Sequence, residues 1–150
     1  MRYMINSYSN EIIKKLEKFF AKAPHMHANT RETLVKIAPW LAVIFGILGI
    51  LGGLSGLGAL TVSAPFAAGV GHATGYGAGF VAVFLWLVYS VLLLVAYPGL
   101  KAKKVRGWKL LFWSEMVSVL SSIIELQLVV AIIGGLIGFY LLFEVKSYYK

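Results

Sequence analysis

Apolar and charged residues follow one another in long blocks along this chain, without the short periods typical of a water-facing domain. Residues 37–100 contain no Asp, Glu, Lys or Arg. A transmembrane helix needs about 20 apolar residues, so this block predicts two spans and a short connection. A second apolar block, residues 110–143, is interrupted by charge only at Glu115 and Glu125. It predicts two more spans if the chain turns just after Glu125.

The pattern therefore predicts an all-α polytopic membrane protein with four transmembrane helices, at about residues 39–62, 78–97, 108–126 and 128–145. A single helix from Trp108 to Tyr148 would be about 60 Å long, twice the thickness of the hydrocarbon core. A turn is thus required, and residues 125–127 are the most polar place for it. We divide the chain into a cytoplasmic or interfacial segment, residues 1–36, and a transmembrane domain, residues 37–150.

The N-terminal segment contains an amphipathic pattern that predicts a helix at about residues 10–23. Asn10 can cap this helix and Pro24 can end it. It is too short to span a bilayer, and its bulky apolar face with flanking lysines is typical of a helix that lies in the cytoplasmic interface. The alternative is that its apolar face packs on the spans or on a partner protein.

Composition and charge agree with a membrane location. The chain is 59% hydrophobic and 13% charged, whereas soluble domains average about 25% charged residues, which excludes a soluble globular protein. The net charge of +8 is concentrated before the first predicted span, between the second and third, and after the fourth. Lys and Arg gather on the cytoplasmic side, so both termini are expected in the cytoplasm. We expect anionic lipid headgroups as partners, and no nucleic acid, at the loop residues Lys101, Lys103, Lys104 and Arg106.

Glycines are concentrated in the first and fourth predicted spans. Small residues four apart let helix backbones approach closely in a bilayer, where burying Leu gains little. The pattern predicts glycine-zipper faces that pack within the chain, between copies in a homo-oligomer, or on another membrane protein. If the third and fourth spans form a hairpin, Ser118 lies level with Gly135, Glu115 with Gly138, and Lys109 with Glu144. The predicted packing glycines are Gly49, Gly52, Gly53, Gly56, Gly134, Gly135 and Gly138.

The third predicted span carries six polar residues within one 120° arc of the helix. A polar stripe on a span faces protein or water, and charged residues there are functional candidates. The competing interpretation is a packing seam whose serines bond back to their own helix. Glu115 at its depth in the span can pair with a cation, sit in a water-filled cavity or take up a proton, and Tyr140 and Lys109 are its candidate partners. The stripe consists of Ser114, Glu115, Ser118, Ser121, Ser122 and Glu125.

Two other segments offer little chemistry. Residues 63–79 are rich in glycine and include His72, and they predict an outer loop or a re-entrant segment. His25 and His27 are spaced as metal ligands can be, but further ligands are missing, so an exposed linker is expected. The chain has no Cys. We therefore expect no metal and no cofactor.

The last third of the chain, from Tyr97-Pro98-Gly99-Leu100 to Lys146-Ser147-Tyr148-Tyr149-Lys150, resembles uncharacterised small four-span membrane proteins of bacteria. The resemblance covers about residues 97–150 and implies a bacterial inner-membrane location, with no activity attached.

Two functions compete. A non-enzymatic scaffold or accessory subunit that assembles through glycine-rich faces is favoured. The alternative is a small channel or transporter with a polar path along Glu115, Ser118, Ser122 and Glu125. An enzyme is disfavoured because Glu115 and Glu125 lie about 15 Å apart along a helix.

Overall fold

The computed structural model describes residues 2–69 and 76–150. All regular structure in these ranges is helical, which confirms the predicted all-α class. Five α-helices are followed by one short 3₁₀ helix. Their bounds are α1 Arg2–Phe20, α2 Ala28–Gly69, α3 Tyr76–Lys101, α4 Val105–Ile124, α5 Leu128–Val145 and η1 Lys146–Tyr148.

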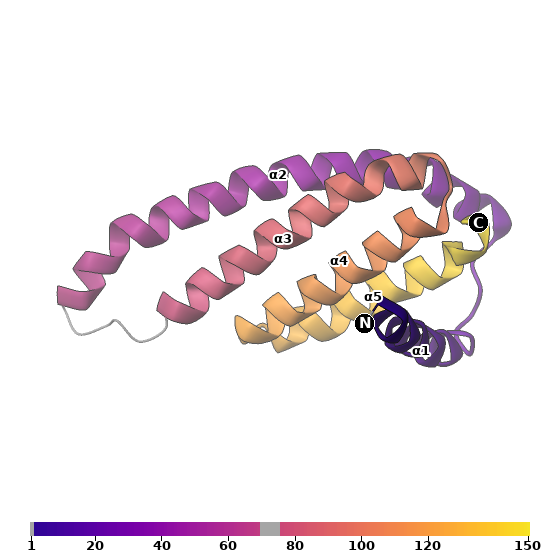
Figure 1. Cartoon of the computed structure of the whole chain (residues 1–150), viewed down its shortest axis with the longest axis horizontal. Helices are drawn as coiled ribbons and strands as arrows, with labels where there is room; N and C mark the ends of the chain where they lie inside the picture. The colour runs from indigo at the N-terminus through magenta and orange to yellow at the C-terminus, as the bar shows by residue number, and fades with distance from the viewer. Residues whose placement is uncertain (1, 70–75) are drawn as a thin grey trace.

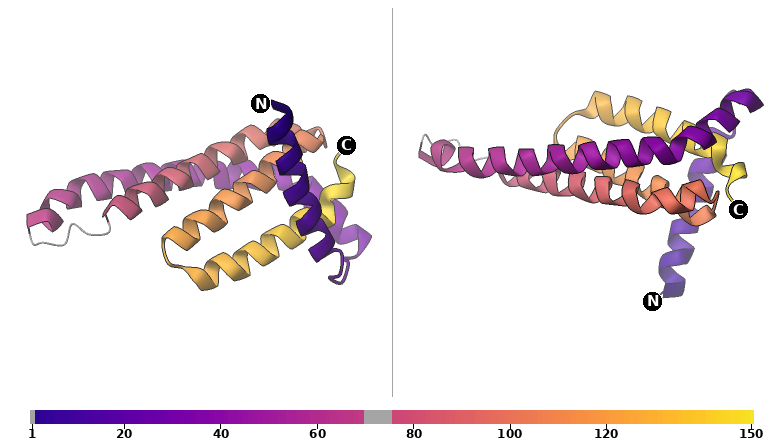
Figure 2. Two further views of the ribbon diagram at one scale, coloured as in Figure 1. Left: turned by 60° about the horizontal axis from the view of Figure 1, so that its bottom comes forward. Right: turned by 90° about the horizontal axis from the view of Figure 1, so that it is seen from above.

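Helices α2 to α5 form two hairpins that lie side by side (Figure 1). α2 pairs with α3 and α4 with α5, while α3 also packs along α4 and joins the two hairpins. α1 crosses the α4–α5 hairpin near the end where the C-terminus lies (Figure 2). The start of α2, the α3–α4 turn and the C-terminus all lie at this end, which we call the basic end because Lys and Arg are concentrated there.

Among the described residues, three helical segments are long and apolar enough to cross a membrane. They are Ala28–Phe66, Tyr76–Lys101 and Leu128–Tyr148. These segments fit a membrane protein. The prediction of four such helices is corrected to three, because α4 carries Arg106, Lys109 and Glu115 beside its serines.

The observed helices run past several predicted ends. α2 has 42 residues and includes both Pro39 and Pro65. α3 continues through Pro98 to Lys101, four residues past the predicted end of the second span at residue 97. A proline removes one backbone hydrogen bond, but the remaining bonds of a long apolar helix carry the helix through it.

The predicted outer loop or re-entrant segment is wrong at both ends. Residues 63–69 belong to α2, and residues 76–79 belong to α3. The expectations for His72 fall outside the described residues. Both helices thus continue through glycine-containing sequence, α2 as far as Gly69 and α3 from Tyr76.

Glycines of α2 allow close contact with α3. A side chain at Gly49 would collide with Ser90, and a Cβ at Gly53 would lie 2.5 Å from Cδ2 of Leu87. Gly56 faces Val83 in the same row. These three glycines lie at the α2–α3 contact, whereas Gly52 faces open space.

The tightest backbone contact lies at the α3–α4 turn and was not predicted. A Cβ at Gly99 would lie 2.7 Å from Cα of Gly107, and a Cβ at Gly107 would collide with the backbone of Gly99 and Leu100. Lys103, in the turn, has a φ of 50°, a left-handed conformation that reverses the chain.

The α4–α5 hairpin turns at Glu125–Gln127, as predicted, with Leu126 at a φ of 60°. A side chain at Gly138 would collide with the carboxylate of Glu115, which confirms that pair. Gly135 faces Val119, one residue from the predicted Ser118, and Gly134 faces open space.

Aromatic residues fill the core at the basic end. Trp108 stacks on Phe112 with ring centroids 5.8 Å apart, and its indole N–H donates to the carbonyl of Leu142 at 2.7 Å. Ile13 of α1 is buried against this cluster, and Phe20 stacks on Phe143. Ile13, Leu16 and Phe20 of α1 therefore pack on the other helices, as the second of the two interpretations has it, while Ile12 and Phe19 of the same apolar face stay exposed.

Candidate polar groove

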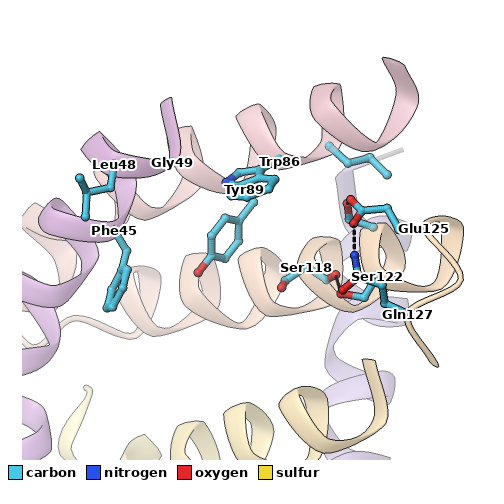
Figure 3. Close-up of a pocket in the computed structure, with 11 residues that line it drawn as sticks. Phe45, Leu48, Gly49, Trp86, Tyr89, Ser118, Ser122, Glu125 and Gln127 are labelled. Atoms are coloured by element: carbon cyan, nitrogen blue, oxygen red, sulfur yellow. Dashed lines mark hydrogen bonds between the residues drawn. The ribbon is translucent and has the colours of Figure 1, made fainter. Parts of the chain in front are cut away.

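A groove of about 440 Å³ lies between α2, α3 and α4, beside the α4–α5 turn. Figure 3 shows side chains that enter it from each of these helices. α2 contributes an apolar wall of Phe45, Leu48 and Gly49, and Gly49 lies at the close α2–α3 contact. α4 contributes Ser118, Ser121, Ser122 and Glu125, which are four of the six residues of the predicted polar stripe.

Hydrogen bonds join the polar residues at the turn end of the groove. The hydroxyl of Ser121 lies 3.2 Å from Oε1 of Glu125 and 3.4 Å from the carbonyl oxygen of Ala82 on α3. The side-chain amide of Gln127 donates to Oε2 of Glu125 at 2.6 Å (Figure 3). These bonds orient the Glu125 carboxylate, which is exposed.

The other two residues of the stripe lie outside the groove. The buried hydroxyl of Ser114 donates to the carbonyl of Leu111 in its own helix at 2.7 Å. Glu115 is on the side of α4 that meets Gly138 of α5. The stripe is therefore divided between two helix contacts, because α4 has α3 on one side and α5 on the other.

The hydrogen bonding of Ser118 and Ser122 is consistent with a packing seam as well as with a polar path for a solute. Ser122 donates to the carbonyl of Ser118 at 3.1 Å, as serines in spans commonly do. Toward the basic end, the polar residues give way to buried Phe112 and Trp108. The polar lining of the groove is thus concentrated at the turn end.

The sequence did not identify Trp86 and Tyr89 as groove residues. Both project from α3, and Tyr89 reaches from α3 toward α4 (Figure 3). α3 packs along both α2 and α4. The signal in the sequence that pointed to Tyr89 was its phenol hydroxyl in the middle of an otherwise apolar span.

A second polar cluster forms where α5 meets the linker between α1 and α2. The buried carboxylate of Glu144 lies 2.7 Å from Nδ1 of His25, accepts the backbone N–H of Met26 at 3.1 Å, and lies 3.6 Å from Nε of Arg31. The hydroxyl of Tyr140 donates to the carbonyl of Pro24.

This cluster corrects two expectations. Glu144 pairs with the linker, while the predicted partner Lys109 has its Nζ 3.4 Å from Oδ1 of Asn10. Tyr140 bonds to the linker instead of Glu115. His25 lies in an exposed linker, as expected, with its side chain 64% exposed. It also has a carboxylate partner 119 residues away, a pairing that sequence spacing could not indicate.

Chemically, the groove offers one exposed carboxylate, several hydroxyls and an indole. Within the described ranges, no group of three His, Asp or Glu residues is placed to hold a metal ion. The predicted headgroup residues Lys101, Lys103, Lys104 and Arg106 are all exposed at the α3–α4 turn. The groove can hydrogen-bond water or a small polar solute.

Comparisons with known proteins identify no relative. No family model, no curated protein and no solved structure matches the chain.

Proposed function

We propose that the protein is a non-enzymatic membrane scaffold or accessory subunit that assembles through small-residue helix faces. The observation that carries this proposal is a face of α2 that folding leaves uncovered. Gly52, Ser55 and Ala59 are exposed at intervals of three and four residues, so they share one side of the helix. A Cβ at Gly52 would have no neighbour within 4 Å. Such a face admits the backbone of another helix closely.

The proposed topology has four spans, with α4 crossing between α3 and α5. α4 has 20 residues and is about 30 Å long, which matches the hydrocarbon core. It packs on a longer apolar neighbour on one side and its hairpin partner on the other, and these neighbours cover its buried serines. The hairpin connections place its two ends level with those of α5.

The basic end is proposed to face the cytoplasm, with both termini there. The rings of Trp40 and Tyr97 lie 6.2 Å apart at this end, and Nζ of Lys101 lies 5.8 Å from the Tyr97 ring centroid. Aromatic rings beside cations are typical of an inner interface. The resemblance of residues 97–150 to bacterial proteins supports placing this interface in a bacterial inner membrane.

Single cysteines test this topology, since the chain has none of its own. Lys103→Cys and Gly69→Cys are expected to react with an impermeant thiol reagent from opposite sides of the membrane. Lys150→Cys is the matched control and should react from the same side as Lys103→Cys. Labelling of all three cysteines from one side would contradict the proposed arrangement.

A pair of neighbouring glycines tests the assembly proposal. Gly52→Leu is expected to keep the melting temperature of the detergent-solubilised monomer, because its side chain enters open space, and to abolish oligomers in native mass spectrometry. Gly53→Leu is expected to lower the melting temperature, because it collides with Leu87. Unchanged oligomers in Gly52→Leu would contradict assembly through this face.

The groove favours a second candidate, a small channel or transporter. It brings together Ser118, Ser122 and Glu125, three of the four residues of the polar path expected from the sequence. Ion or proton flux in proteoliposomes that Glu125→Gln abolishes, in a variant with an unchanged melting temperature, would favour this candidate over the scaffold.

A further inference from the structure

A second cavity, also of about 440 Å³, lies at the basic end between α1 and the α4–α5 hairpin. α1 crosses the hairpin there (Figure 2), and it contributes Ile13, Lys14 and Glu17 to the cavity wall. Its walls come from elements far apart in the sequence, so folding alone assembles them. Among them are Ile13, Lys14, Trp108, Lys109, Lys146 and Tyr149.

The charge around this cavity is positive. Lys14 comes from α1, Lys109 from α4 and Lys146 from η1, and Glu17 is the one carboxylate among the lining residues. Nζ of Lys146 lies 2.6 Å from Oε2 of Glu17. Among the described residues, Lys14 and Lys109 have no ion-pair partner.

The hydroxyl of Tyr149 is an unsatisfied hydrogen-bond donor in the wall of the cavity. Its side chain is 5% exposed, and within the described part of the chain its buried hydroxyl has no hydrogen-bond partner. Burial raises the pKa of Tyr149, so the hydroxyl stays protonated at neutral pH. A buried donor without an acceptor is costly, so an anionic oxygen in the cavity would relieve that cost.

Apolar rings complete the cavity. Trp108, on its wall, is 1% exposed, and Ile13 is buried beside it. The cavity therefore combines cations and a hydroxyl with apolar surface at the level where Trp and Tyr mark the membrane interface. Basic pockets between membrane helices on the cytoplasmic side are typical sites for anionic lipid headgroups.

We propose that this cavity binds the phosphate of an anionic phospholipid at the inner interface. Lys14 and Lys109 neutralise the phosphate and the Tyr149 hydroxyl donates to it, while the lipid's apolar part lies against the exposed Val105 and the half-buried Phe143, which also line the cavity. The bound lipid joins α1 to the α4–α5 hairpin. This site is separate from the exposed loop lysines and does not depend on assembly through α2.

Binding of phosphatidylglycerol to the purified full chain in detergent tests the proposal, with phosphatidylcholine as the uncharged comparison. The double variant Lys14→Gln/Lys109→Gln is expected to lower phosphatidylglycerol affinity about tenfold or more, since each nearby lysine attracts an anionic lipid by roughly one factor of five. The control Lys15→Gln/Lys36→Gln removes the same charge from exposed positions outside the cavity and is expected to change the affinity less than about twofold. Equal losses in the two double variants would overturn the proposal.

Tyr149→Phe provides a test that does not change charge. The lipid-free protein is expected to melt at the same or a higher temperature, because an unpartnered buried hydroxyl is removed. The rise in melting temperature on adding phosphatidylglycerol is expected to shrink. An unchanged rise would contradict the role of the hydroxyl.

Inorganic phosphate distinguishes a lipid from a soluble phosphate as the ligand. At millimolar concentration it is expected to leave the melting temperature unchanged and not to displace phosphatidylglycerol. If inorganic phosphate alone reproduces the stabilisation, the lipid assignment is wrong.

Discussion

Gly107→Ala is expected to prevent normal packing of α3 on α4. The added Cβ would collide with the backbone of Gly99 and Leu100, which cannot rotate aside as a flexible side chain can. Overpacking of side chains typically costs 1–3 kcal/mol, and a backbone collision is expected at or above the upper end, roughly 3 kcal/mol. The measurement is the melting temperature of the purified protein in detergent, together with its yield from the membrane.

Gly134→Ala is the matched control for Gly107→Ala. Gly134 is also a helical glycine, but a Cβ there would meet nothing within 4 Å. Because alanine favours a helix over glycine by about 1 kcal/mol, this variant is expected to melt at the same or a higher temperature. A similar fall in melting temperature in both variants would show that the Gly99–Gly107 contact does not cause the destabilisation of Gly107→Ala.

Trp108→Ala is expected to have the second large effect. The Trp108 ring packs on Phe112 and Phe143, and its indole N–H donates to Leu142 on α5. Removing a buried tryptophan typically costs 3–5 kcal/mol in soluble proteins, and a loss of roughly that size is expected here, where the ring joins α4 to α5. Melting in detergent and protease sensitivity of the α4–α5 hairpin measure it.

Trp113→Ala controls for loss of a tryptophan as such. Trp113 is five residues along the same helix, is 37% exposed, and touches Phe112 only at a ring edge. Trp113→Ala is expected to lower the melting temperature much less than Trp108→Ala. Trp108→Phe is expected to lower it by an intermediate amount, because it keeps the ring packing and loses the hydrogen bond to Leu142. Equal destabilisation by the two alanine variants would contradict the central role of Trp108.

Features that depend on helix length and helix rise could be predicted from the sequence. The α4–α5 turn was expected at residues 125–127 because one straight helix would be twice the thickness of the hydrocarbon core, and it lies there. The contact of Gly138 with Glu115 followed from the rise of two antiparallel helices. Helix ends were less predictable, since Pro39, Pro65 and Pro98 all lie inside helices.

The sites depended on contacts that the sequence does not encode locally. The polar stripe of α4 was predicted as one surface, yet Glu115 faces α5 and Ser121 faces α3, because α4 has a neighbour on each side. The sequence also could not show which glycines another helix covers and which it leaves exposed. Gly52 and Gly53 are adjacent, and only the direction of α3 decides that Gly53 is covered.

By itself, the sequence determined the helical class, the apolar segments and the clustering of cations, because hydrophobicity and charge act on each segment independently of its neighbours. The tertiary structure alone decided the partners of Glu144, the contact between Gly99 and Gly107, and the cavity that brings Lys14, Lys109 and Tyr149 together. Those residues are 8 to 135 positions apart, and only the packing of α1, α3, α4 and α5 against one another brings them within reach.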